Sequence, residues 1–222
     1  KRQLITWLAG LGYAAASLGY RLATGAASNN YPAQAEDVRC GLRYLRANAA
    51  TYGIDTTRVA AIGDSAGGHL AMILGTASGV TGLDGTCPYL SQPVDVDATV
   101  AFYGPSDLRA GSAFVTFDPW PAESLLGVAP HLNPARATLA SPIAHVDPTD
   151  GYFLLVHGTA DTIVPIASSR LMHAELVAHG VPSTLLEMPG AGHEFAEISQ
   201  EAWLRTSSCT TIAFLDATIG LP

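Results

Sequence analysis

The sequence predicts an α/β fold in which a mostly parallel central sheet is covered by helices on both faces. The first observation is a set of short apolar runs, each closed by glycine, proline or a turn, at residues 59–63, 98–103, 152–156 and 183–188. The second is helical periodicity between them, which makes the strands parallel because each crossover lays its helix over the sheet. The third is size and composition: 222 residues, 48% of them hydrophobic and 14% charged, suffice for a single domain over residues 1–222.

Helices are predicted before, between and after the strands. In residues 33–52, Val38, Leu42, Leu45 and Ala49 fall on one face. Residues 168–179 repeat this pattern, and Gly180 is expected to end that helix. Beyond Phe195 the pattern favours a closing helix whose buried face the sequence does not define.

The connection over residues 106–150 departs from this alternation, because it is rich in proline and short on periodicity. A connection this long inside a compact α/β domain is usually functional, so we expect a lid or one wall of a pocket. The alternative is a surface excursion with one short helix around residues 122–126.

Charge and cysteine content limit the partners. Eleven Lys and Arg against 19 Asp and Glu give a net charge of −8, which disfavours nucleic acid and is compatible with a small neutral substrate. Cys40, Cys87 and Cys209 show no C-x-x-C spacing, which argues against a zinc or redox site. Their odd number permits at most one disulfide, and three unpaired thiols are the expected state. No cofactor or metal is predicted, because neither H-E-x-x-H nor a comparable cluster occurs.

The main chemical signal is G-x-S-x-G at residues 63–67, placed after an apolar strand and before a helical run at 68–74. A serine held on a tight turn at the carboxyl end of a strand is exposed for attack, and flanking glycines let neighbouring backbone pass without a Cβ clash. The helix that follows points its first N–H groups at the developing oxyanion. We therefore predict Ser65 as a nucleophile.

A nucleophilic serine needs a base and an orienting acid. His193 lies in a glycine-rich turn just past the last apolar strand, where an imidazole could reach over the sheet. Asp161 lies in a loop that leaves the carboxyl end of the preceding strand, and parallel sheets place their active sites along that edge. The chain order Ser65, Asp161, His193 is the serine–acid–histidine order of α/β-hydrolases.

The other histidines are assigned structural roles. His157 ends a strand and is expected to brace the following loop, and His69 is expected to pack against the sheet. Four more are expected to be solvated in loops or on a helix surface: His131, His145, His173 and His179. Among the acids, Asp147 and Asp150 precede their strand and fall at the wrong end of it, and the Asp64 side chain should point away from His193.

From residue 20 to about residue 195 the chain resembles an α/β-hydrolase esterase of the hormone-sensitive-lipase-like kind, near the feruloyl- and acetylxylan-esterase-like branch. The matching segments are spread over most of the chain: Tyr-Arg-Leu-Ala at 20–23, residues 32–38, Tyr-Gly-Ile-Asp at 52–55, residues 63–71, Phe-Tyr-Gly-Pro at 102–105, Ser-Pro-Ile at 141–143, residues 157–165 and residues 190–195. The resemblance implies carboxylic-ester hydrolysis through an acyl-enzyme on Ser65. His193 would be general base and then acid, Asp161 would hold it, and the N–H of Ala66 would form half of the oxyanion hole.

The amino-terminal stretch has two incompatible interpretations. Residues 4–20 carry no charge and follow Lys1 and Arg2, as in a secretory signal or membrane anchor. However, the run contains glycine, serine and tyrosine and stops at Arg21, short of the ~20 residues needed to span a bilayer. The resemblance implies instead a helix over residues 2–10 and a strand over residues 13–19, with no membrane partner.

The same resemblance exposes a gap. Family members carry a strand ending in a His-Gly-Gly-Gly type loop, whose N–H groups form the other half of the oxyanion hole, and this chain contains no such sequence. That strand normally lies between those expected at residues 13–19 and 59–63. We expect that the amino-terminal strands are missing from this chain; the alternative is that the remaining strands close up and the hole is built differently.

The favoured function is a serine carboxylesterase acting on short acyl or aryl esters. An amide-cleaving relative, such as a peptidase or arylformamidase-like enzyme, would share the triad, and a catalytically weak binding protein on a hydrolase scaffold is a further alternative.

Trp120, Ile163, Val164 and Phe195 are candidates to line the substrate pocket, although each could be ordinary core. The strand at residue 183 is expected at a sheet edge, where it could pair in a homodimer. The compartment is not predicted.

Overall fold

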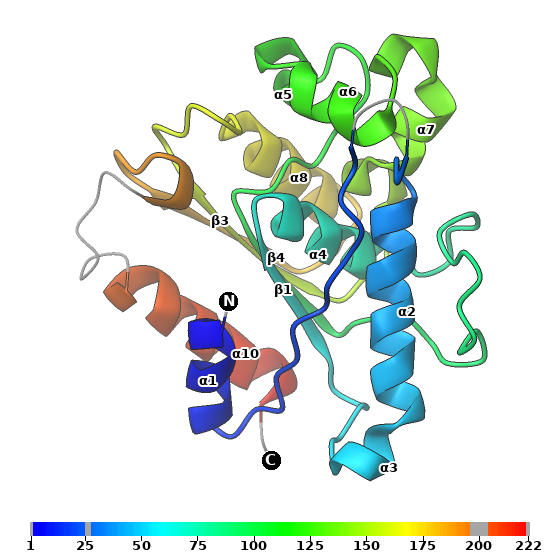
Figure 1. Ribbon diagram of the computed structural model, residues 1–222. Coiled ribbons are helices and arrows are strands. Elements are labelled where there is room, and N and C mark those ends of the chain that lie inside the picture. The colour runs from blue at the N-terminus through cyan, green and yellow to red at the C-terminus, as the bar shows by residue number, and fades with distance from the viewer. Residues whose placement is uncertain (1, 25–27, 196–203, 221–222) are drawn as a thin grey trace.

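The fold is built on a parallel sheet, described by a computed structural model that covers residues 2–24, 28–195 and 204–220 (Figure 1). Its strands are β1 (Ala60–Asp64), β2 (Ala98–Phe102), β3 (Tyr152–Gly158) and β4 (Ser183–Met188). They are parallel and hydrogen-bonded in the order β1-β2-β3-β4 within the described residues. Each predicted apolar run is therefore confirmed as a strand, and β4 lies at an edge of this sheet.

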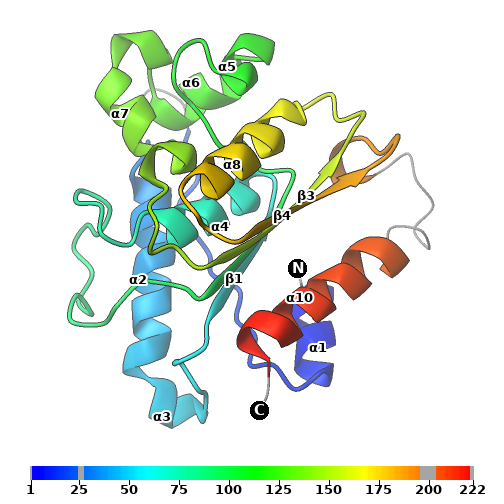
Figure 2. The same ribbon diagram turned by 180° about the vertical axis from the view of Figure 1, so that it is seen from behind.

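Helices cover both faces of the sheet, as predicted. One face carries α2 (Ala33–Ala47), α4 (Ala66–Thr76) and α8 (Ala167–Ala178), and the other carries α1 (Arg2–Gly10) and α10 (Cys209–Ile219) (Figures 1 and 2). Because helices cover both faces, successive side chains of β3 pack alternately on one face and then the other. Phe153 and Leu155 pack toward α4 and α8, whereas Leu154 and Val156 pack toward α1 and α10. A short α3 (Ala49–Tyr52) extends α2, so the predicted helix over residues 33–52 is confirmed apart from a break at Asn48.

The strand predicted over residues 13–19 is wrong. These residues have no regular secondary structure, although α1 before them forms as expected. The segment runs beside α2 (Figure 1), and Leu18 and Tyr20 pack on the cluster formed by α2, α4 and β1. A strand requires a hydrogen-bonded neighbour, and in the described part of the chain the outer edge of β1 pairs with no strand. No strand of the described residues therefore occupies the position beside β1 where the family's additional strand would lie.

The connection over residues 106–150 contains five short helical segments rather than one. They are α5 (Ala113–Phe117), α6 (Trp120–Leu126), η1 (Pro130–Leu132), α7 (Pro134–Leu139) and η2 (Pro142–His145). Three of them begin at a proline, which suits the first position of a helix because its missing N–H is not needed there. The segments bury their own apolar side chains, Phe114, Leu126 and Ala137 among them, against α2 and α4. The expectation of one short helix around residues 122–126 is therefore wrong in its count of helices.

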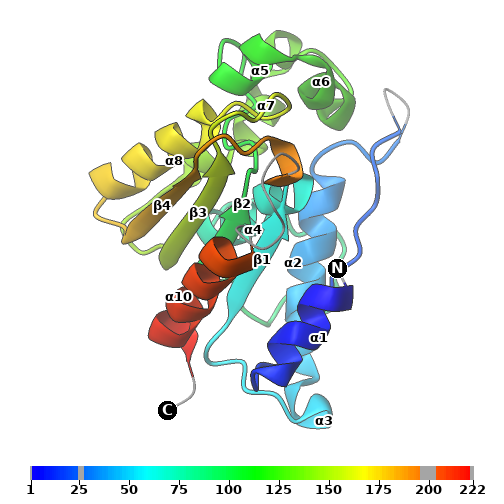
Figure 3. The same ribbon diagram turned by 90° about the vertical axis from the view of Figure 1, so that its left-hand side faces the viewer.

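The remaining turns lead to the carboxyl terminus. A 3-10 turn, η3 (His193–Phe195), follows β4, and a π-helical turn, η4 (Leu204–Ser208), leads into α10. The predicted closing helix is confirmed as α10, which buries Thr211 and Leu215. Figure 3 shows α10 and α1 side by side across the face of the sheet opposite α2, α4 and α8.

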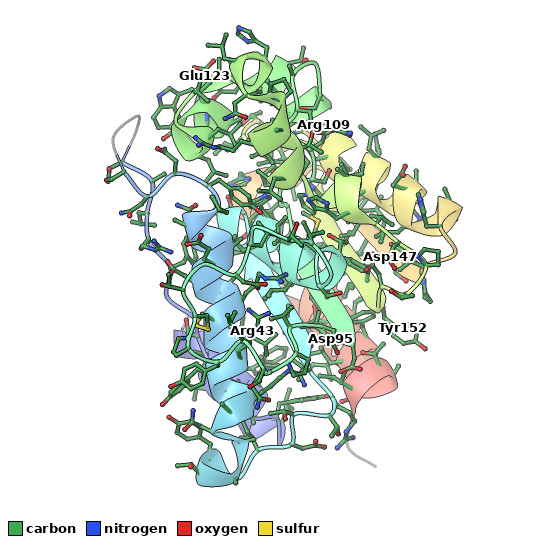
Figure 4. The ribbon with its side chains drawn as sticks, turned by 90° about the vertical axis from the view of Figure 1, so that its right-hand side faces the viewer. Arg43, Asp95, Arg109, Glu123, Asp147 and Tyr152 are labelled. Carbon is green, nitrogen blue, oxygen red and sulfur yellow. A yellow bond between two sulfur atoms is a disulfide. The ribbon has the colours of Figure 1, made fainter. Side chains whose placement is uncertain are left out.

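The expectation of three unpaired thiols is also wrong. Cys40 on α2 forms a disulfide with Cys87, and Cys209 is free and exposed. The disulfide joins α2 to the long loop after α4, where Arg39 and Arg43 of α2 both donate to Asp84. Figure 4 shows Arg43 and the opposing loop on this face of the molecule. The sequence could not reveal the pair, because the two cysteines meet only when α2 and this loop have packed together.

Candidate active site

Ser65 occupies a strained turn between β1 and α4. Its backbone has φ 52° and ψ −118°, a conformation that non-glycine residues rarely adopt. The N–H of Ser65 donates to the carbonyl oxygen of Phe102 at the end of β2 (2.9 Å), which fixes the turn against the sheet. The side chain is half-buried and lies at the carboxyl edge of the strands. This is the position predicted for a nucleophile.

Two glycines around Ser65 are required by close backbone packing, but they are not the two of the G-x-S-x-G pattern. A Cβ on Gly63 would lie 2.1 Å from the carbonyl oxygen of Gly67, and one on Gly68 would lie 2.8 Å from that of Phe102. A Cβ on Gly67 would meet nothing closer than Asp64 Oδ1 at 3.8 Å. The steric argument made from the sequence therefore holds for Gly63 and Gly68 and not for Gly67.

The structure brings Ser65, His193 and Asp161 into one hydrogen-bonded chain. His193 Nε2 lies 3.0 Å from Ser65 Oγ, and His193 Nδ1 lies 2.8 Å from Asp161 Oδ2. With its proton on Nδ1, the neutral imidazole donates to the carboxylate and accepts from the serine hydroxyl. The loops that carry the two residues are tied together, since the N–H of Ala160 donates to the carbonyl oxygen of Ala191 (2.9 Å). All three residues come from loops at the carboxyl edge of the sheet.

Asp161 is held as an ionised carboxylate. It is 8% exposed, and its Oδ1 accepts from the N–H groups of Ile163 (2.8 Å) and Val164 (2.9 Å). Burial acts to raise the pKa of Asp161, but hydrogen bonds from His157, His193 and these two N–H groups outweigh it and lower the pKa to about 2. The carboxylate therefore remains available to orient and stabilise a protonated His193 at neutral pH.

Most of the remaining histidines are structural. His157 is fully buried and bonds Val164 and Ser169, so the expectation that it braces the loop is confirmed. His69 is buried on α4 and bonds the carbonyl oxygen of Ala140, and burial lowers the pKa of His69 to about 4. His131 and His179 are exposed, as expected. The expectation for two others is wrong, because half-buried His145 bonds the carbonyl oxygen of Leu139 and half-buried His173 bonds Ser183.

Tyr103 belongs to the site but was not predicted. It follows β2 with φ 40°, and its ring packs edge to face on the His193 imidazole, with centroids 4.7 Å apart. Burial raises the pKa of Tyr103, and the nearby charges of Asp64, Glu194 and Asp161 raise it further. The ring therefore stays neutral and packs beside the imidazole. The sequence placed Tyr103 in a family-like segment, but no pattern showed that its ring would reach His193.

The oxyanion-hole candidate Ala66 and the four candidate pocket residues differ in their exposure to solvent. Ala66 is exposed and begins α4, where the first N–H groups of a helix have no intrahelical acceptor. Trp120 is 70% exposed and lines a hollow of about 510 Å³ with Glu123, which Figure 4 labels. Ile163 is 52% exposed, whereas Val164 and Phe195 are 3% exposed and lie in core clusters. The assignment of these four side chains to a pocket stays a prediction.

Two further findings concern metals and membranes. Among residues 2–24, 28–195 and 204–220, no group of three or more His, Cys, Asp and Glu side chains is arranged to hold a metal ion. Within the same residues, no helix combines the length and apolar character needed to cross a bilayer.

A parallel sheet, a strand–Ser65–helix turn and the Ser65–His193–Asp161 arrangement together define an α/β-hydrolase. The BD-FAE family model matches residues 1–176, and the chain belongs to this family of α/β-hydrolase esterases, in the hormone-sensitive-lipase-like and feruloyl-esterase-like branch.

Among curated proteins, the chain is similar to Esterase LipC of Mycobacterium tuberculosis, with 30% identity over 195 residues that cover 86% of this chain and 47% of that protein. Among solved structures, it is similar to a truncated form of a carbohydrate esterase from gut microbiota (TM-score 0.74, 30% identity, 88% of this chain and 72% of that one). It is also similar to an acetyl ester-xyloside bifunctional hydrolase from Caldicellulosiruptor lactoaceticus (TM-score 0.77, 26% identity, 97% and 75%). The chain spans about half the length, or less, of the curated esterases it matches.

Proposed function

We propose that this chain is a serine carboxylesterase that hydrolyses small carboxylic esters through an acyl-enzyme on Ser65. The observation that carries the proposal is the hydrogen-bonded chain from Ser65 Oγ through the His193 imidazole to the Asp161 carboxylate, at 3.0 and 2.8 Å. Membership of an esterase family supports the same reaction class.

The proposed reaction has two halves with the same proton path. Ser65 Oγ attacks the ester carbonyl carbon while His193 Nε2 takes its proton, and Asp161 stabilises the imidazolium. The tetrahedral intermediate collapses, the C–O bond to the alcohol breaks, and His193 gives its proton to the leaving oxygen. Water then attacks the acyl-enzyme with His193 again as base, and collapse of the second intermediate releases the acid and restores Ser65.

Stabilisation of the oxyanion sets the expected rate. We assign one donor, the N–H of Ala66 at the start of α4, to the oxygen that becomes negative. The His-Gly-Gly-Gly type loop that supplies the other donors in the family is absent from this sequence. Because loss of one donor typically costs about 10²–10³ in kcat, we expect these 222 residues to turn over slowly.

The substrate class is a small-molecule ester, and acetylated sugars are reasonable candidates within it. The carbohydrate esterase and the acetyl ester-xyloside hydrolase, both similar in structure to this chain, suggest that choice by their names. Amide cleavage is a second candidate, since the triad alone does not separate the two reactions. The esters are favoured because the curated relatives are named esterases.

The test is hydrolysis of p-nitrophenyl acetate, butyrate and octanoate, with p-nitroacetanilide as the matched amide. Ser65→Ala should abolish turnover, and Ser91→Ala, an exposed serine on the loop after α4, serves as the control. A fluorophosphonate probe should label wild type and leave Ser65→Ala unlabelled. Folded wild type that neither hydrolyses the esters nor takes the label would contradict the proposal and favour a binding protein.

We also propose that residues 1–222 act as one catalytic domain, with residues 106–150 forming a wall beside the active site. Support comes from the position of α5, α6 and α7 at the end of the molecule where the His193 loop lies (Figure 3). Pairing of the β4 edge in a homodimer stays a prediction, which sedimentation would test.

A further inference from the structure

His157 is a fully buried titratable side chain beside the active site that the proposed mechanism does not use. It is the penultimate residue of β3, four residues before Asp161. Its Nε2 lies 2.9 Å from the carbonyl oxygen of Val164 and 3.2 Å from Asp161 Oδ2, and its Nδ1 lies 2.7 Å from Ser169 Oγ on α8. Every nitrogen of the ring therefore has a partner, and one partner is the carboxylate that orients His193.

The partners of His157 define where its proton sits. A carbonyl oxygen and an ionised carboxylate can only accept, so Nε2 must carry the hydrogen that faces Val164 and Asp161. In the neutral ring Nδ1 is then an acceptor, and the Ser169 hydroxyl is the donor placed to satisfy it. Ser169 is itself 3% exposed, which keeps water from replacing it.

This N–H completes the surroundings of the Asp161 carboxylate. Oδ1 faces the N–H groups of Ile163 and Val164, while Oδ2 faces His193 Nδ1 and His157 Nε2. A carboxylate offers about four acceptor positions, and four N–H groups face them. Rotation of the carboxyl group would break bonds on both oxygens, so the lone pair directed at His193 stays in place.

We propose that His157 is a positioning residue for the active site, whose Nε2 lies 3.2 Å from Asp161 Oδ2, holds that carboxylate in place and thereby limits how strongly Asp161 attracts a proton onto His193. The inference rests on the proposed function, since it concerns the same triad. An extra donor stabilises the negative charge of Asp161, so the carboxylate holds a neighbouring imidazolium less tightly. The lowering of the Asp161 pKa to about 2, opposed by burial, has His157 as its largest hydrogen-bond contribution. Loss of this contact should therefore strengthen the attraction between Asp161 and a protonated His193.

Other charged groups near these side chains do not replace this contact. The Glu187 carboxylate on β4 is paired with Arg170 at 2.7 Å. Near His193, the charges of Asp64 and Glu194 act on the adjacent Tyr103. A carboxylate has no N–H to donate, so neither acid can bond Asp161 as His157 does.

The test compares His157→Leu, which removes the donor, with His157→Gln, whose amide can keep an N–H near the position of Nε2. His173→Gln is the matched control, because His173, on α8, bonds the Ser183 hydroxyl as His157 bonds that of Ser169 but is not a partner of Asp161. The first readout is the pH midpoint of the His193 ring titration, followed by NMR. We expect an upward shift of about 0.5 to 1 pH unit in His157→Leu, a smaller shift in His157→Gln and none in His173→Gln.

The second readout is the pH dependence of kcat/KM, whose acid limb should move upward with the ring titration. If His157 only supported the loop, its loss would free Asp161 from His193, and the midpoint would move down instead. An unchanged or lowered midpoint in folded His157→Leu would overturn the proposal.

Wild-type protein gives a test that needs no folded variant. The ¹⁵N shifts of His157 should show a protonated Nε2 and an unprotonated Nδ1, and the reverse assignment would overturn the proposal. Neither NMR measurement requires turnover, so a folded chain that neither hydrolyses the esters nor takes the fluorophosphonate label would refute the proposed function without deciding this one.

Discussion

Gly63 and Gly67 look equivalent in the G-x-S-x-G pattern, yet the structure predicts opposite outcomes when each is replaced by alanine. A Cβ at position 63 would lie 2.1 Å from the Gly67 carbonyl oxygen, where ordinary contact begins at 3.4 Å. The end of β1 and the first turn of α4 would have to separate by 3.4 − 2.1 = 1.3 Å. Ser65 lies between these two elements, and a misplacement of roughly 1 Å can cost about 10²-fold in rate. We expect Gly63→Ala to lower kcat/KM by about that factor.

Gly67→Ala is the matched control for this prediction. Its new Cβ would meet only Asp64 Oδ1 at 3.8 Å, and alanine favours the helix by roughly 1 kcal/mol over glycine. We expect activity within about threefold of wild type and an equal or higher Tm. The assay is p-nitrophenyl acetate hydrolysis with thermal unfolding of each variant, or the rate of fluorophosphonate labelling where turnover is too slow. Gly63→Ala with wild-type activity, or Gly67→Ala with the larger loss, would refute the steric reasoning.

Three further predictions follow from the charges and the disulfide. Asp161→Asn should lower kcat by about 10⁴. The variant should also have a lower free energy of unfolding than wild type above about pH 4. This difference should vanish as the pH falls toward 2, because the pKa of Asp161 in the folded protein is lowered to about 2. Burial raises the pKa of half-buried Asp150 to about 6, so ionisation of Asp150 opposes folding as the pH rises through that value. Urea unfolding should therefore show that Asp150→Asn stabilises the protein by about 1 kcal/mol at pH 7.5 and not at pH 4. Replacing Cys40 and Cys87 by serine opens a cross-link between residues 47 apart, for which chain entropy gives about 4 kcal/mol and a fall of roughly 10 °C in Tm. A fall below about 2 °C under oxidising conditions would show that the bond contributes little.

The parts of the fold that could be predicted are those set by local pattern and chain order. Buried parallel strands need continuous apolar runs, so β1 to β4 were visible in the sequence. Ser65, Asp161 and His193 could be grouped because each follows a strand, and the carboxyl ends of parallel strands share one edge. The structure brings His193 within hydrogen-bonding distance of both Ser65 and Asp161, while the catalytic roles of the three stay a proposal.

The parts that were missed depend on contacts across the chain. The strand expected at residues 13–19 needs a neighbour to bond, and its sequence alone could not show that none of the described strands would pair with it. The Cys40–Cys87 disulfide and the packing of Tyr103 on His193 likewise arise from side chains that meet only in the folded state. Residues 106–150 were underestimated because helices of three to seven residues are too short to produce a periodic pattern.

The pairing of α1 with α10 has a consequence for how the chain folds during synthesis. Leu8 and Leu215 share one apolar cluster, and the Tyr13 hydroxyl donates to Asp216, so α1 is covered by a helix that lies 215 − 8 = 207 residues later in the chain. At roughly 5–20 residues per second, α1 would wait on the order of 10–40 s for that partner. During this interval one face of the sheet lacks its final cover, and apolar surface of this kind is where nascent chains aggregate or recruit chaperones. Formation of this helix pair should accordingly come after synthesis of β1 to β4, which lie between the two helices in the chain.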